Sequence, residues 1–309
     1  MTYCTGPETA GERILNVAKD FAITFKDYPN FGFFWMNSFS HNKLNSPTGM
    51  DNKIKSFLVD LANSGVLETS IVIFLSDHGM RFGEFRLTET GWFEERLPFI
   101  YLSFPEWFKE KHSKEYFNFR NNTYRLTSPY DLHVTLKHIL VLSGHNYTVR
   151  PSNACPKCRS LFEEADAERS CEDAGIAQHW CTCSGYTSLN LTKAVEARVA
   201  GYLLSQIHDI IRSRNGDYLC AKYTLNKVIS SSISSQFLYK NDSYLLIKME
   251  TSPKAVFETT ISFYGNIAES RQFSISGDIS RLDSYSAHST CVSDAYLKKY
   301  CYCHSKSRI

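Results

Sequence analysis

The sequence predicts an α/β fold, with a parallel sheet flanked by helices and a smaller antiparallel β-rich C-terminal region. A short apolar run, FGFFWM at 31–36, is typical of a strand buried on both faces. A helical pattern over 51–65 and a β-branched run, SIVIFL at 70–75, follow it. Strand, helix and strand in this order indicate a right-handed crossover between parallel strands. We expect a charged loop over 80–96 and a further strand over 97–103.

Two predicted helices have clear end signals. Asp51 is a favourable N-cap, apolar residues recur after it at three- and four-residue spacing, and Gly65 supplies the left-handed residue that often ends a helix. A later helix begins with Ser128 as N-cap, Pro129 at its first position and Asp131 as the capping-box acid.

The second half of the chain has a different pattern. Cysteines crowd a loop-rich segment over 153–183, and 194–212 is a predicted amphipathic helix. Alternating, Ser/Thr-punctuated segments then predict antiparallel strands. We therefore expect two domains: 1–185, which includes the Cys-rich linker, and 186–309, a helix with a β-rich region. The predicted antiparallel strands cover 244–249, 255–264 and 272–279.

Composition excludes several classes of protein. The chain has 309 residues, of which 43% are hydrophobic and 14% aromatic, enough for a sizeable core. Its 34 basic and 32 acidic residues lack the one-sided charge of a nucleic-acid binder. Its longest apolar runs fall far short of the roughly 18 residues that a membrane span needs. The first fifteen residues do not have the pattern of a secretory signal.

Cysteines and sequons indicate a secreted protein or one of the ER lumen. Ten cysteines are an even number that suits a disulfide framework, and four Asn-x-Ser/Thr triplets are candidate glycosylation sites. The alternative is a cytosolic protein with reduced thiols. The candidate glycosylation sites are Asn121, Asn146, Asn190 and Asn241.

The Cys-rich segment allows a second interpretation. Cys155 and Cys158, with His179, Cys181 and Cys183, resemble the ligand set of a zinc knuckle. The spacing between the pairs is longer than in common zinc ribbons, and the sequons favour an oxidising compartment. Disulfides are therefore the favoured interpretation.

Asp77-His78-Gly79 follows the SIVIFL segment directly. At the carboxyl end of a strand in a parallel sheet, loops converge and ligands bind. A carboxylate and an imidazole suit Zn²⁺, Mn²⁺ or a similar ion, and Gly79 permits the sharp turn that brings both to one ion. The competing interpretation is a turn in which Asp77 caps the loop.

Three further residues complete the candidate site. His41 follows the FGFFWM run and would share an edge of the sheet with Asp77 and His78. Arg81 and Arg86 lie in the charged loop, where a guanidinium can bind a phosphate or sulfate oxygen in a bidentate manner. The alternative for this loop is a solvated face that neutralises its own charges.

Several ordered motifs resemble one known superfamily. The string SIVIFLSDHGMRFGEFRLTETGWFEERLPF, with SFSHNKLN before it and RLTSPYDLHVTLKHIL after it, resembles the alkaline-phosphatase-like, sulfatase-like superfamily. The likeness is closer to its animal branch, which is described only as a domain of unknown function. RSLFEE and RSCEDAGIAQHWCTC are also similar to that branch. The likeness covers about residues 4–183.

This resemblance implies a metal-dependent hydrolase of phosphoric or sulfuric esters. Asp77 and His78 would be ligands of a divalent metal, Zn²⁺, Mn²⁺ or Ca²⁺, and His41 would contact the transferred group or its leaving oxygen. The segment 91–98 would be largely architectural. Asn42 stands where the branch usually has Asp, which weakens the negative charge there.

The resemblance also implies that an early part of the domain is missing. In such enzymes the nucleophile and the first metal carboxylates come from a strand upstream of the FGFFWM position. We therefore expect a fragment of a longer secreted protein, without turnover, whose incomplete sheet exposes apolar surface. The alternative is a secreted, non-catalytic glycoprotein that binds a partner through its Cys-rich and β-rich part.

Overall fold

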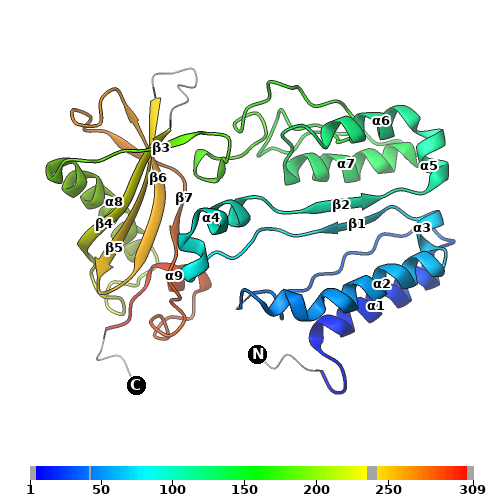
Figure 1. Ribbon diagram of the computed structural model, residues 1–309, viewed down its shortest axis with the longest axis horizontal. Helices are drawn as coiled ribbons and strands as arrows, with labels where there is room; N and C mark the ends of the chain where they lie inside the picture. The colour runs from blue at the N-terminus through cyan, green and yellow to red at the C-terminus, as the bar shows by residue number, and fades with distance from the viewer. Residues whose placement is uncertain (1–4, 42, 235–241, 305–309) are drawn as a thin grey trace. The chain divides into compact units, whose positions relative to one another are not determined.

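The computed structural model describes residues 5–41, 43–234 and 242–304 (Figure 1). The chain forms two compact units. The first unit comprises 1–80, 97–150 and 159–167, and the second comprises 81–96, 151–158 and 168–309. The second unit thus takes two segments from within the sequence of the first.

The first unit is mainly helical. A capping box formed by Thr9 and Glu12 begins its first helix, α1, which the sequence analysis did not predict. Ion pairs hold α1 against α2: Lys19 Nζ lies 2.9 Å from Asp60 Oδ2, and Glu12 also pairs with Lys53. The elements are α1 (Ala10–Phe25), η1 (Ser46–Met50), α2 (Asp51–Asn63), α3 (Val66–Thr69), β1 (Val72–Leu75), β2 (Ile100–Ser103), α5 (Glu106–Lys111), α6 (Ser113–Asn122) and α7 (Pro129–Leu142).

The prediction of a parallel sheet is wrong. β1 pairs with β2 in an antiparallel ladder, with Val72 opposite Ser103 and Leu75 opposite Ile100. The described residues of this unit form no other sheet. A short apolar run predicts a strand but not its direction, which depends on how the connecting segment returns. Here residues 76–99 bring the chain back beside β1 in the opposite direction.

The predicted strand at 31–36 is also wrong. These residues have no regular secondary structure and pair with no strand. The ring of Phe34 packs at 5.7 Å on Phe21 of α1, and Phe33 stacks on Trp35. Phe31 and Phe33 are 72% and 69% exposed. Aromatic contacts with a helix replace the backbone ladder that a buried strand would need.

The helix predictions of the first unit are confirmed. α2 begins at Asp51, but this residue is the first of the helix and not the predicted N-cap, a position that Met50 holds without a side-chain cap. α7 begins after Ser128, whose backbone N–H donates to Asp131 Oδ2 at 2.8 Å in a capping box. The expected loop over 80–96, in contrast, contains the short helices η2 (Glu84–Leu87) and α4 (Glu89–Arg96), which belong to the second unit.

The second unit is built on a five-stranded antiparallel sheet in the order β3-β4-β5-β6-β7. The predicted antiparallel C-terminal region is therefore confirmed, although β3 and β4 were not foreseen. The predicted helix over 194–212 is also present, as α8 (Figure 1). The further elements are η3 (Gln178–Trp180), β3 (Tyr186–Ser188), α8 (Lys193–Ser213), β4 (Thr224–Ser234), β5 (Asp242–Ser252), β6 (Val256–Tyr264), β7 (Phe273–Arg281) and α9 (Ala295–Tyr300).

The two faces of strand β6 have different surroundings. Phe257 and Ile261 join an apolar cluster with residues of α8 such as Leu203 and Ile207, none of which has exposed surface. The alternate positions carry Glu258 and Thr260, which contact residues of the 81–96 segment and of η3. Because side chains alternate along a strand, one β-strand serves both an apolar core and a polar interior.

The described residues form four disulfides, all within the second unit. This supports the disulfide interpretation of the Cys-rich segment over the zinc knuckle and is consistent with an extracellular protein. Cys183 is an exposed free thiol, and Cys4 lies outside the described residues. The bonded pairs are Cys155–Cys158, Cys171–Cys181, Cys220–Cys301 and Cys291–Cys303.

Candidate metal centre

Asp77 and His78 follow directly on the β1–β2 ladder. Ser76 extends the ladder by one residue, because its N–H donates to Phe99 O at 3.0 Å and its Oγ accepts from Phe99 N at 3.1 Å. The chain leaves the two-stranded sheet at Asp77. Asp77 and His78 are therefore held in place by the paired strand that precedes them.

The two side chains converge. Asp77 Oδ2 lies 3.3 Å from His78 Nε2, while Asp77 Oδ1 accepts from the backbone N–H of His78 at 2.9 Å. His78 Nδ1 lies 2.6 Å from Gly79 O. The side chains are 53% and 27% exposed, respectively, so solvent and ions reach them.

Both ring nitrogens of His78 face oxygen atoms that can only accept. A neutral imidazole has one N–H and one acceptor lone pair. When Nδ1–H donates to Gly79 O, the lone pair of Nε2 faces the lone pairs of Asp77 Oδ2. Either a second proton on the ring or a metal ion between Nε2 and Oδ2 would remove this repulsion.

The spacing of the two ligand atoms suits a metal ion. Two atoms that each lie about 2.1 Å from a tetrahedral Zn²⁺ are about 3.4 Å apart. The contact of Nδ1 with a backbone carbonyl is the arrangement that fixes the tautomer of a metal-binding histidine. Within the described part of the first unit, no third His, Cys, Asp or Glu groups with this pair.

His41 is exposed in a turn of the first unit that precedes α2. Its predicted neighbour Asn42 lies outside the described residues. The rim of a parallel sheet, on which the placement of His41 beside the pair was argued, does not exist in the structure. A shared site of His41 with Asp77 and His78 therefore stays a prediction.

The two predicted substrate-binding arginines differ in exposure. Arg81 is exposed, whereas Arg86 has no exposed surface. Arg86 Nη2 donates to Glu258 Oε1 at 2.6 Å, and its Nε donates to Glu95. Arg86 could bind an ester oxygen only if its contacts with Glu95 and Glu258 were broken.

Arg86 belongs to a buried ion network that the sequence analysis missed. Arg96 completes it, donating to Glu95 Oε2 at 2.9 Å and to Glu258 Oε1 at 3.1 Å. Burial opposes ionisation of Glu258, but the positive charges of Arg86 and Arg96 outweigh it and lower the pKa of the carboxyl. The sequence does carry one signal of this network, because Glu258 is an acidic residue inside the otherwise uncharged strand sequence VFETTISF.

His179 lies beside this network and is fully buried. Its Nδ1 and Nε2 lie 3.2 Å from Thr260 Oγ1 and 3.0 Å from Ser280 Oγ, and its backbone carbonyl accepts from Arg96 Nε at 3.0 Å. Burial, together with the charge of Arg96, lowers the pKa of His179 to about 3. This histidine is therefore neutral at physiological pH.

The candidate glycosylation sites are accessible where the structure describes them. Asn146 and Asn190 are exposed, and Asn121 is half-buried near the end of α6. Asn241 lies outside the described residues.

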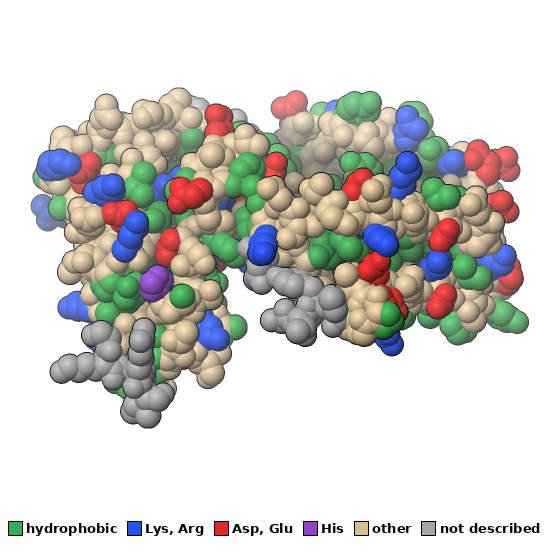
Figure 2. Space-filling view, turned by 60° about the horizontal axis from the view of Figure 1, so that its bottom comes forward, with side chains coloured by type: hydrophobic (Ala, Val, Ile, Leu, Met, Phe, Trp, Pro, Cys, Tyr) green, Lys and Arg blue, Asp and Glu red, His purple; other side chains and the backbone are tan. Residues whose placement is uncertain are grey.

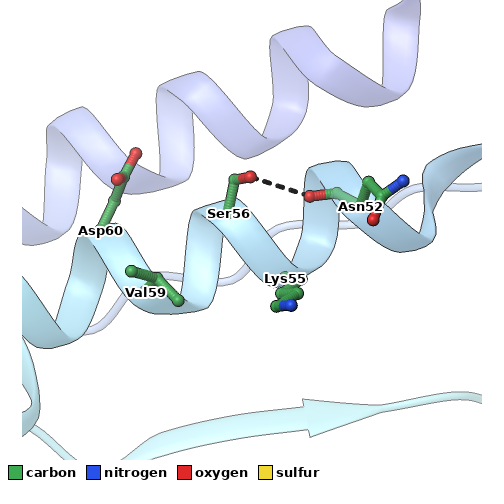
Figure 3. Close-up of a pocket in the computed structure, with 5 residues that line it drawn as sticks. All are labelled: Asn52, Lys55, Ser56, Val59 and Asp60. Carbon is green, nitrogen blue, oxygen red and sulfur yellow. Dashed lines mark hydrogen bonds between the residues drawn. The ribbon is translucent and has the colours of Figure 1, made fainter.

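A shallow hollow on α2 is lined by one helix alone, with Ser56 Oγ bonded to Asn52 O (Figure 3). Basic and acidic side chains are interspersed over the face shown in Figure 2. No described helix has the length and apolar character needed to cross a membrane. The residues that line the hollow are Asn52, Lys55, Ser56, Val59 and Asp60.

The fold and site define a disulfide-bonded protein with a solvent-accessible Asp-His pair directly after strand β1 of a two-stranded antiparallel sheet. The chain belongs to the family described as "Protein of unknown function (DUF229)", whose model matches residues 1–229. That match covers the whole first unit and reaches into β4 of the second. Neither the curated proteins nor the solved structures contain a match to the chain.

Proposed function

We propose that Asp77 and His78 bind a divalent metal ion in a hydrolase-like protein of the class that acts on phosphoric or sulfuric esters. The observation that carries the proposal is the 3.3 Å approach of Asp77 Oδ2 to His78 Nε2. The resemblance of the surrounding motifs to the sulfatase-like superfamily supplies the substrate class. In this proposal the pair follows a strand of a two-stranded antiparallel sheet rather than a strand of a parallel sheet.

Each residue has a distinct task in the proposed site. Asp77 supplies a hard oxygen ligand and His78 a nitrogen ligand, a combination that suits Zn²⁺ or Mn²⁺ and, through the carboxylate, Ca²⁺. A bound ion of this kind would neutralise charge on the ester oxygens. His41 would assist the leaving oxygen as a general acid, as the resemblance implies.

We expect metal binding without ester turnover from this chain. A hydrolytic metal site needs more ligands than two, and the described residues of the first unit add no third one to the pair. Aryl phosphate and aryl sulfate, each tested with Zn²⁺, Mn²⁺ and Ca²⁺, are the substrates to assay. Metal-dependent turnover that is lost in Asp77→Ala would contradict this expectation.

Isothermal titration with Zn²⁺ and Mn²⁺ tests the proposed ligands directly. Asp77→Asn and His78→Gln are each expected to weaken binding at least tenfold. The matched controls are Asp209→Asn and His145→Gln, which change an exposed carboxylate and an exposed imidazole elsewhere. Equal affinity in all four variants, or no binding to the unsubstituted chain, would leave the proton as the cation between Asp77 and His78 and refute the proposal.

A non-catalytic secreted glycoprotein is the second candidate function. The concentration of all four disulfides in the second unit favours it, because disulfides stabilise extracellular binding modules. Failure of the metal titration, with the second unit intact, would favour this candidate over the first.

A further inference from the structure

Three sulfur atoms lie together in the Cys-rich segment. Cys171 and Cys181 form a disulfide, and Cys183 is a free thiol. The Sγ atoms of all three lie within 4.8 Å of one another. Cys171 and Cys181 are buried, whereas Cys183 is exposed, so a solvated thiol stands beside a protected disulfide.

A second sulfur cluster in the same unit has no such thiol. The Sγ atoms of Cys291, Cys301 and Cys303 also lie within 4.8 Å of one another. Cys291 is bonded to Cys303, and Cys301 to Cys220. Similar proximity without a free thiol makes this cluster an internal comparison for the first.

We propose that Cys171, Cys181 and Cys183 form a thiol–disulfide exchange site in which Cys183 competes with Cys181 for Cys171. The thiolate of Cys183 attacks the Sγ of Cys171 and forms a new S–S bond. The bond between Cys171 and Cys181 breaks, and its electron pair leaves on the Cys181 sulfur, which then takes up a proton. One disulfide and one thiol are present before and after, so no oxidant or reductant is required.

The shared partner in this exchange is Cys171. Attack on Cys181 would instead join two cysteines separated by a single residue, where the short loop restricts disulfide geometry. Exchange at Cys171 moves the disulfide that tethers this residue two positions along the chain, from Cys181 to Cys183.

The exchange acts on the segment that carries His179. That histidine belongs to η3, which lies between Cys171 and Cys181 in the sequence and contacts Thr260 of β6. In the bonded form observed here, the tether closes directly after η3. In the exchanged form it closes two residues later, so η3 is held less tightly at its C-terminal end. The exchange site thereby regulates how firmly η3 is docked on the sheet.

The variant Cys181→Ser tests whether Cys183 can replace Cys181. The full chain is equilibrated in a buffer of reduced and oxidised glutathione, quenched with acid, alkylated under denaturing conditions and mapped by mass spectrometry. We expect a Cys171–Cys183 disulfide and no alkylation at either residue. Alkylation of both, or glutathione on either, in a chain whose Cys220–Cys301 and Cys291–Cys303 bonds are intact, would overturn the proposal.

The unsubstituted chain tests whether the exchange takes place in the native protein. After incubation at pH 8 without glutathione, acid quench and alkylation, label is expected on Cys181 as well as on Cys183. In Cys183→Ser, label on Cys181 should disappear, and the cluster of Cys291, Cys301 and Cys303 should stay unlabelled in both chains. Label on Cys183 without label on Cys181 in the unsubstituted chain would overturn the proposal.

Discussion

The two units bury their apolar residues in different ways. In the second unit, twenty buried residues of α8, α9, the sheet and adjoining segments form one described core cluster. The described core cluster of the first unit contains three, Phe104, Phe108 and Phe162, with partly buried neighbours around them. All four disulfides also lie in the second unit.

Apolar content therefore does not measure burial in this protein. The first unit carries the most apolar short runs of the sequence, but its aromatic side chains Phe31, Phe33 and Tyr101 are largely exposed. The strands of the second unit look more polar, with Ser and Thr at many positions, but apolar residues such as Phe257 and Ile261 are buried in one cluster with residues of α8. Burial depends on a complementary face as well as on hydrophobicity.

Breaking the buried ion network should have the largest effect. Glu258→Gln removes a carboxylate that neutralises two buried guanidinium groups, those of Arg86 and Arg96. We expect the free energy of unfolding to fall by about 3–5 kcal/mol, because buried charges lose their partner. Denaturant unfolding measures this. The control Glu106→Gln, which removes an exposed partner of Lys109, should cost less than about 1 kcal/mol.

One buried and one exposed substitution together test the comparison most directly. Leu203→Ala in α8 creates a cavity at a fully buried position and should lower the free energy of unfolding by about 2–5 kcal/mol. Phe33→Ala, at an exposed position of the first unit, should change it by about 0.5 kcal/mol or less. A large loss from Phe33→Ala would show that the exposed aromatic residues have a stabilising partner in solution.

The stability of the second unit should also depend on pH through His179. Its pKa is about 3 in the folded chain against the ordinary 6.5, so the unfolded chain binds the extra proton first. The stability that comes from keeping His179 neutral is therefore complete above pH 6.5 and is lost as the pH falls toward 3. Between pH 6.5 and 5.0 we expect a loss of about 1.5 kcal/mol.

Hydrogen exchange of β6 peptides measures this loss, and His179→Gln is the control. Gln cannot take up the proton. In His179→Gln, the loss of stability between pH 6.5 and 5.0 should therefore be smaller by about 1.5 kcal/mol. The interval lies above the range in which Glu258 and Asp278, the carboxylates that interact with His179, ordinarily titrate. An unchanged pH dependence in His179→Gln would exclude the buried histidine as its cause.

Local sequence signals predicted local structure well. The N-cap at Ser128 and the helical spacing after Asp51 each depend on neighbours within one or two turns, and both helices are present. The strand at 70–75 is present as β1. Strand direction and the pairing of 31–36 were wrong because both depend on residues far away in the sequence. Arg86 and Glu258, 172 residues apart, could not be matched for the same reason.

The sequence by itself determined the helices with strong caps, the alternation of the C-terminal strands and the adjacency of Asp77 and His78, because each is a property of a short stretch of chain. The tertiary structure alone decided that β1 and β2 run antiparallel, that Arg86 is buried among carboxylates, and that Cys183 lies beside a disulfide. These features arise when distant segments share one interior, where desolvation and close contact set which charges and sulfur atoms become partners.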